Sequence, residues 1–251
     1  MYAIIAVLIM TGCASTVVTK KRWVECLTLC GVSAALLCGL AACGSQPQNS
    51  EPLSICGTTT DFIPVNKYKG PLSWVQSREG AVGRLNRGCS GTFIGKHGNQ
   101  NNLFITAGHC LAKGDAAKVE FNYEANPDGP VITVRGVALE SSNNPDYALI
   151  RLDQNPGVSP TPFGSASAKL AIIQHPETKP KVIAFGKLAS SKGGKIYYSN
   201  LDTLGGSSGS GILNDSGSLV GVHTNGGCSK SGGTNSGWNI SNIIQASSIL
   251  K

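Results

Sequence analysis

Three short stretches of this sequence each supply one of the side chains that acyl transfer by serine requires. Ser208 stands in a run of glycines and serines, His109 ends the apolar stretch LFITAGH, and Asp146 directly precedes the apolar stretch YALIRL. A serine hydroxyl becomes a nucleophile when a histidine takes its proton and a carboxylate orients that histidine. The three stretches therefore predict a serine hydrolase in which Ser208 is the nucleophile, His109 the base and Asp146 the orienting acid.

The glycines around Ser208 indicate how such an enzyme would stabilise the negative charge that develops on the substrate oxygen. Glycine adopts unusual φ/ψ values, so consecutive N–H groups of a tight turn can converge on one point. Each stretch alone has a more common structural explanation: a loop, a structural or metal-binding histidine beside Cys110, and a turn before a strand. It is their combination in one chain that indicates catalysis.

The elements that must position these residues are predicted to be strands. Short apolar segments alternate with turn sequences such as NPDG at 126–129 and NDSG at 214–217, which is typical of all-β barrels or sandwiches. The segment 155–162 (NPGVSPTP) is a candidate joint between two halves, and the tail 239–250 is predicted to form a short closing helix. The predicted strands span residues 81–85, 90–94, 103–106, 117–123, 131–139, 148–153, 171–175, 181–188, 195–199, 211–213, 219–224 and 237–240.

Charge and histidine spacing exclude several function classes. The formal charge is +7, but after Lys20–Arg22 the basic residues are spread along the chain without interleaved aromatic residues, so a nucleic-acid partner is not expected. The four histidines show no metal-ligand spacing, and no metal or other cofactor is expected. These histidines are His97, His109, His175 and His223.

Residues 1–43 are predicted to be a lipoprotein signal peptide. The cationic stretch Lys20–Arg22 precedes the apolar run 27–42, which ends in Leu-Ala-Ala-Cys at 40–43. This ending resembles the bacterial lipobox, in which the cysteine, here Cys43, is lipidated and becomes the first residue of the mature protein. The chain is therefore expected to be an exported bacterial lipoprotein, anchored by lipid in the cell envelope at the outer membrane, or a secreted protein. An uncleaved membrane anchor is the alternative.

The rest of the chain is predicted to consist of a tether or N-terminal extension at 44–79 and a catalytic domain at 80–251. Removal of the signal leaves four cysteines besides Cys43, and an even number in an oxidising compartment predicts two disulfides. The spacing of these cysteines leaves all three pairings open. They are Cys56, Cys89, Cys110 and Cys228.

The three chemical stretches resemble a known family when their flanking residues are included. TAGHC at 106–110 resembles the histidine motif of trypsin-like serine proteases, DYALI at 146–150 their aspartate motif, and GSSGSG at 206–211 their serine motif, in the order His, Asp, Ser. Within that class, residues 172–184 and 220–227 are similar to bacterial glutamyl endopeptidases and exfoliative toxins. The resemblance covers roughly residues 80–245, and its motifs are highly specific in combination.

This resemblance implies a fold and an activity. The expected fold is chymotrypsin-like and all-β: two six-stranded antiparallel β-barrels, at about 80–160 and 161–240, with a short C-terminal helix and the active site in the cleft between the barrels. The expected activity is that of a monomeric serine endopeptidase acting on protein or peptide substrates.

The resemblance also implies roles for further residues. The N–H groups of Gly206 and Ser208 would form the oxyanion hole. Cys89 and Cys110 match the disulfide that flanks the histidine loop, which leaves Cys56 and Cys228 to pair with each other. Thr224 would lie beneath Asp146, and the backbone of Thr224, Asn225 and Gly226 would pair with an extended substrate.

The residues that would choose the substrate point in two directions. Thr203 and His223 match the positions at which glutamyl endopeptidases hold a substrate carboxylate, which favours cleavage after Glu, and by extension Asp. Asp202, however, falls where trypsin keeps its pocket aspartate, which would attract Lys or Arg. Leu204 replaces the cysteine that fixes this loop in trypsin, so Asp202 can turn outward. Cleavage after Glu is preferred here, with Lys/Arg specificity as the alternative.

Departures from the family and two competing functions complete the sequence-based prediction. Ser207 replaces the usual Asp or Asn, and Gly211 replaces the usual Pro. The animal enzymes pair that Asp with a freed N-terminus, so activation by that route is not implied. The run GGSSG also matches the G-x-S-x-G motif of α/β-hydrolases, with Ser207 as nucleophile and Asp215 and His223 as partners, but the chain lacks an alternating β/α pattern. A catalytically silent binding lipoprotein would have lost a triad member, and none is lost.

Overall fold

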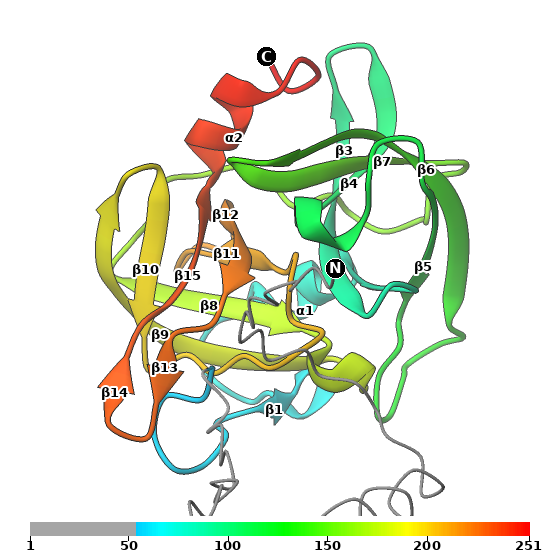
Figure 1. Ribbon diagram of the computed structural model, residues 1–251. Coiled ribbons are helices and arrows are strands. Elements are labelled where there is room, and N and C mark those ends of the chain that lie inside the picture. The colour runs from blue at the N-terminus through cyan, green and yellow to red at the C-terminus, as the bar shows by residue number, and fades with distance from the viewer. Residues whose placement is uncertain (1–53) are drawn as a thin grey trace, which may run out of the picture. The chain divides into compact units, whose positions relative to one another are not determined.

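The structure is a computed structural model that describes residues 54–251 (Figure 1). The signal peptide, Cys43 and the first part of the tether lie outside the described residues, so lipidation and anchoring stay predictions. Within residues 54–251, no helix is both long enough and apolar enough to cross a membrane.

Six antiparallel strands form the first barrel, which closes in the order β2-β3-β4-β7-β6-β5. Phe104 and Phe121 are fully buried and meet edge to face with ring centroids 5.8 Å apart, a geometry that aromatic pairs favour. The strands are β2 (Val82–Leu85), β3 (Cys89–His97), β4 (Gln100–Thr106), β5 (Ala116–Phe121), β6 (Ile132–Asn143) and β7 (Asp146–Leu152).

Six further strands form the second barrel in the order β8-β9-β10-β15-β12-β11, which the pairing of β11 with β8 closes. Its own apolar core includes Ile172, Ile196, Ile212 and Val220, all buried. The strands are β8 (Lys169–Gln174), β9 (Val182–Lys192), β10 (Lys195–Ser199), β11 (Gly211–Leu213), β12 (Leu219–Asn225) and β15 (Asn235–Asn239). The helix α2 (Ile240–Ala246) follows β15 near the C-terminus, as Figure 1 shows. The predicted fold of two six-stranded barrels and a short C-terminal helix is confirmed.

All twelve predicted strands appear, most of them within two or three residues of their expected ends. Residues 155–162 lie within the connection from β7 to β8, which joins the two barrels. Three short strands were not predicted: β1 (Ile63–Pro64), β13 (Cys228–Ser229) and β14 (Gly232–Gly233). Each has only two residues, too few to produce a periodic pattern in the sequence.

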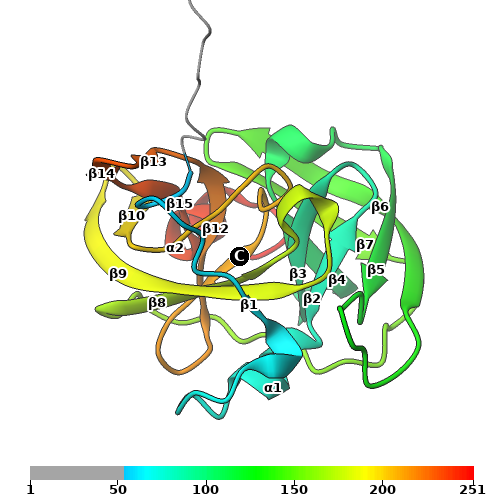
Figure 2. The same cartoon turned by 90° about the horizontal axis from the view of Figure 1, so that it is seen from below.

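The segment before the first barrel is folded against the two barrels. Its strand β1 pairs with β9 of the second barrel, which Figure 2 shows from below. The 3-10 helix η2 (Val65–Lys67) and the helix α1 (Val75–Glu79) follow, and the buried side chains of Val65 and Val75 join the main apolar core.

A buried cation connects α1 to both barrels. The Lys181 ammonium is fully buried and lies 2.7 Å from the Glu79 carboxylate and 3.0 Å from that of Glu124. Lys181 precedes β9, Glu124 follows β5, and Glu79 ends α1. Burial and the neighbouring Glu79 raise the pKa of Glu124 to about 7. A buried charge is stable only with such partners, so Lys181 fixes the three elements together.

The Lys181 cluster predicts a large loss of stability when the cation is removed. We expect Lys181→Met to lower the free energy of unfolding by about 3–5 kcal/mol, because the buried carboxylates lose their partner. Lys96→Met, at an exposed position of β3, is the matched control and should change it by less than about 0.5 kcal/mol. Urea unfolding measures both, and equal effects of the two substitutions would contradict the assigned role of Lys181.

Candidate active site

His109 and Asp146 meet at one end of the first barrel. β4 pairs with β7 so that Thr106 lies opposite Ala148, and His109 follows β4 in the 3-10 helix η3 (Gly108–Cys110), while Asp146 begins β7. The His109 Nδ1 lies 2.8 Å from Asp146 Oδ2, and the His109 backbone N–H donates to Asp146 Oδ1 at 3.0 Å. One carboxylate therefore fixes both the ring and the backbone of His109.

The electrostatics of this pair suit a base. Burial opposes the ionisation of Asp146, but the hydrogen bonds from His109 hold its pKa below the usual 3.8, so the carboxylate stays charged. The hydrogen bond to Asp146 raises the pKa of His109 above 6.5. When neutral, the ring donates Nδ1–H to the carboxylate, which leaves the Nε2 lone pair free to accept a proton.

Ser208 comes from the second barrel, in the loop of residues 200–210 that joins β10 to β11, here called the serine loop. The Ser208 carbonyl accepts the Ser90 N–H at 2.8 Å, and the Ser90 hydroxyl donates to the Gly206 carbonyl at 2.8 Å. Ser90 lies in β3, and the disulfide between its neighbour Cys89 and Cys110 connects β3 to the residue after His109. These bonds hold the serine loop beside η3, which carries His109. No hydrogen bond joins Ser208 Oγ to His109 within residues 54–251; in enzymes without substrate this contact is often long.

The serine loop directs two N–H groups away from its own acceptors. The Gly205 carbonyl accepts the Glu177 N–H, and the Ser207 carbonyl accepts the Ser210 N–H. A trans peptide places its C=O and N–H on opposite sides, so the N–H groups of Gly206 and Ser208 point the other way. Neither has an acceptor among residues 54–251. Both are free to bind an oxyanion.

Glycine is required at two positions of this loop. Gly206 has φ +94° and Gly209 has φ +87°, values that other residues rarely adopt. A Cβ at Gly209 would lie 2.1 Å from Thr106 Oγ1, and one at Gly206 would lie 2.7 Å from the His175 carbonyl oxygen. A side chain at Gly209 would push the serine loop away from the end of β4, which leads to His109, and one at Gly206 would push it away from the backbone of residues 175–178.

The two pocket candidates Thr203 and His223 are both buried. Thr203 is fully buried, and its Oγ1 has no hydrogen-bond partner within the described residues. His223 lies in β12 and exchanges backbone hydrogen bonds with Gly209 and Ser210. Burial, together with the charge of His109, lowers the pKa of His223 to about 4, although a hydrogen bond to the Ser236 backbone acts to raise it. The His223 ring is therefore uncharged at neutral pH.

Tyr198 fixes which nitrogen of His223 carries the proton. The Tyr198 hydroxyl is hydrogen-bonded to His223 Nδ1, and burial raises the pKa of Tyr198 well above 10. This hydroxyl has no other partner within residues 54–251, so its proton is satisfied only by donation to Nδ1. Nε2 of His223 then carries the remaining ring proton. Nothing in the sequence marks Tyr198 for this role, since it stands among the alternating residues of a strand.

Asp202 differs most from the expectation of a trypsin-like pocket. It is buried, and its two carboxylate oxygens accept the backbone N–H groups of Cys56 and Asp61, at 2.7 and 2.9 Å. Both donors belong to the segment predicted to be a tether or extension. Asp202 is therefore turned toward the N-terminal segment.

Three further candidates lie at the end of β12. The hydroxyl of Thr224 donates to Asn225 Oδ1 at 2.8 Å rather than to Asp146. Asn225 and Gly226 are exposed, which leaves their backbone open to an extended chain. Elsewhere, Cys89, Cys110 and His109 bring their donor atoms within 4.8 Å of one another, but the two sulfur atoms form a disulfide and cannot act as thiolate ligands.

Comparison with known proteins decides the family. The family model described as a trypsin-like peptidase domain matches residues 89–222, which include His109, Asp146 and Ser208. The chain belongs to the trypsin-like peptidase family. No curated protein matches this trypsin-like peptidase significantly.

Solved structures share the fold of this trypsin-like peptidase at low sequence identity. A serine endoprotease from Yersinia pestis is 16% identical (TM-score 0.55), with 70% of this chain and 66% of that chain covered. The HtrA-type protease AlgW, solved with a tripeptide, is 17% identical (TM-score 0.54), with 68% and 60% covered. A Glu endopeptidase in complex with MPD is 21% identical (TM-score 0.56), with 76% and 99% covered. This peptidase thus spans less than two thirds of the first two chains.

The His109–Asp146 pair predicts the pH dependence of activity. His109 must be neutral to accept a proton, and its pKa lies above 6.5, so activity should fall as the pH decreases through a midpoint above 6.5. Asp146→Asn should lower both this midpoint and the rate. Measurement of kcat/KM against pH tests this, and an optimum near pH 4 would contradict it.

Proposed function

We propose that this chain is a serine endopeptidase that uses His109, Asp146 and Ser208. The observation that carries the proposal is the His109–Asp146 pair at 2.8 Å, which leaves Nε2 of His109 free. The two serine-loop N–H groups that have no acceptor within residues 54–251 support it. Base, orienting carboxylate and oxyanion donors are the parts that acyl transfer needs around a serine.

The reaction follows from these parts. Nε2 of His109 takes the proton of the Ser208 hydroxyl as Oγ attacks the carbonyl carbon of the scissile peptide bond, and the Gly206 and Ser208 N–H groups stabilise the oxyanion. The imidazolium then gives its proton to the leaving amine as the C–N bond breaks. Water, deprotonated by the same ring, hydrolyses the acyl-enzyme and restores Ser208.

Preference for Glu before the scissile bond is the second part of the proposal. Thr203 Oγ1 is buried without a partner, a costly state unless a ligand or water satisfies it. A substrate carboxylate would accept hydrogen bonds from this hydroxyl and from His223 Nε2–H, both charge-assisted. Lys/Arg specificity is less well supported, because both oxygens of Asp202 already accept backbone N–H groups. Lipidation at Cys43, which would place the enzyme in the cell envelope, stays a prediction.

Removal of the nucleophile tests the proposed reaction. Ser208→Ala and His109→Ala should each lower kcat/KM by on the order of 10⁴-fold or more, with residual catalysis from the oxyanion donors. A fluorophosphonate probe should label the wild type, and peptide mapping by mass spectrometry should find the label on Ser208. Labelling of Ser207 instead would favour the α/β-hydrolase-like alternative. Absence of label and of peptide cleavage in the folded wild type would favour a silent binding protein.

A peptide library tests the proposed specificity. We expect cleavage after Glu, and Thr203→Val should lower kcat/KM for Glu substrates by about tenfold, because it removes one hydrogen bond to a charged group. The same substitution at exposed Thr133 is the matched control and should have no effect. Cleavage after Lys or Arg that is lost in Asp202→Ser would refute the Glu preference and leave only the triad.

A further inference from the structure

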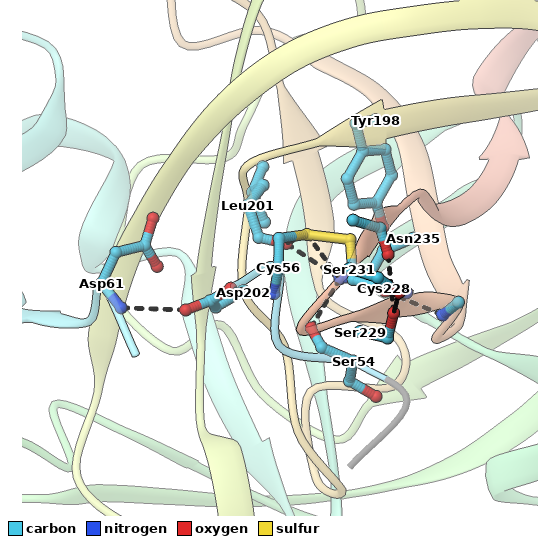
Figure 3. The surroundings of a disulfide bond; sticks show 12 residues. Ser54, Cys56, Asp61, Tyr198, Leu201, Asp202, Cys228, Ser229, Ser231 and Asn235 are labelled. Atoms are coloured by element: carbon cyan, nitrogen blue, oxygen red, sulfur yellow. Dashed lines mark hydrogen bonds between the residues drawn. A yellow bond between two sulfur atoms is a disulfide. The ribbon is translucent and has the colours of Figure 1, made fainter. Parts of the chain in front are cut away.

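The segment of residues 54–61 forms a clasp around the start of the serine loop, shown in Figure 3. A disulfide joins Cys56 to Cys228, and the Ser54 carbonyl accepts the Thr203 N–H at 3.1 Å. Asp202, next to Thr203, accepts the N–H groups of Cys56 and Asp61. The clasp thus binds two consecutive residues of the serine loop, Asp202 through its side chain and Thr203 through its backbone.

The side chain of Asn235 connects the clasp to its surroundings. It is fully buried, and its Nδ2 donates to the Ser54 carbonyl at 2.8 Å and to the Leu201 carbonyl at 2.9 Å. Its Oδ1 accepts the N–H groups of Gly227 and Cys228, at 2.9 and 3.1 Å. One amide therefore holds together the clasp, the serine loop and the segment after β12.

The hydrogen bonds of Asp202 indicate that its side chain holds the backbone of the clasp rather than binding a positively charged substrate side chain. Each oxygen accepts a backbone N–H group, and the residue is only 2% exposed. The side chain of Asp61 also lies beside it, and burial together with the neighbouring Asp202 raises the pKa of Asp61 to about 7. Charge-assisted hydrogen bonds of this kind are among the stronger ones in proteins. They also fix the direction of the backbone at the next residue, Thr203. The Thr203 hydroxyl has no hydrogen-bond partner within the described residues.

We propose that Asp202 is a positioning residue that, with the clasp of residues 54–61, holds Thr203 in place for the substrate side chain. The inference rests on the proposed peptidase function. It makes the segment before the barrels part of the specificity machinery. In this arrangement backbone N–H groups within the chain hold the serine loop, so a free amino terminus is not required for that purpose.

The test separates substrate positioning from the chemistry at Ser208. Asp202→Asn in the full chain replaces one acceptor oxygen by a donor, so one of the two backbone N–H groups of the clasp loses its acceptor. We expect KM for peptide substrates to rise and kcat/KM to fall by about ten- to a hundredfold. The rate of fluorophosphonate labelling, which depends on Ser208 and His109, should stay within about twofold. Asp128→Asn, the same change at an exposed position, should leave both readouts unchanged.

A second variant keeps the test decisive if Asp202→Asn does not fold. Cys56→Ala combined with Cys228→Ala loosens the clasp and leaves Asp202 intact, and it should shift KM in the same direction by a smaller factor. Unchanged KM in a folded variant, or equal losses in labelling and peptide cleavage, would overturn the proposal. Selective loss of cleavage after Lys or Arg would overturn it too. A wild type that neither takes the label nor cleaves peptides would instead refute the proposed function.

Discussion

Ser90 makes four hydrogen bonds, two of them to the serine loop, and the geometry of the candidate active site depends on them. Its N–H binds the Ser208 carbonyl, its hydroxyl donates to the Gly206 carbonyl and accepts the His175 N–H, and its carbonyl accepts the Thr106 hydroxyl. Nucleophile and base come from different barrels, so the distance between them depends on contacts that cross from one barrel to the other, such as these. Ser90 is fully buried, where such bonds are not exchanged with water.

Two buried charged groups extend this constraint to the segment before the first barrel. Lys181 binds Glu79 of α1, and Asp202 binds the N–H groups of the clasp. Each group is too costly to bury alone, so the segment that satisfies it must stay folded whenever the barrels do. Residues 54–79 thus add three things to the second barrel: strand β1, the disulfide from Cys56, and the Glu79 carboxylate that pairs with Lys181.

The sequence predicted most of the barrels but little of what precedes them. Strands are visible because alternating apolar residues must face a barrel interior, and the triad motifs are visible because their chemistry needs particular side chains. The contacts of Asp202 were not foreseeable, since the N–H groups that it binds belong to Cys56 and Asp61, and backbone donors carry no sequence signature. Ser90 and Tyr198 were missed because a buried serine or tyrosine in a strand has many structural uses. The replacement of a loop cysteine by Leu204 indicated that Asp202 could turn outward, but not which N–H groups it would then bind.

The disulfide between Cys56 and Cys228 spans 172 positions and encloses His109, Asp146 and Ser208 in one covalent ring. The proposed endopeptidase activity would make the exposed turns of one molecule possible cleavage sites for another copy. A single cut anywhere between residues 57 and 227 would open the ring without separating the two pieces. A cut between residues 90 and 109 would be bridged twice, because the Cys89–Cys110 bond also crosses it. Under oxidising conditions a nicked molecule would keep its full mass, and only a reducing agent would reveal the fragments.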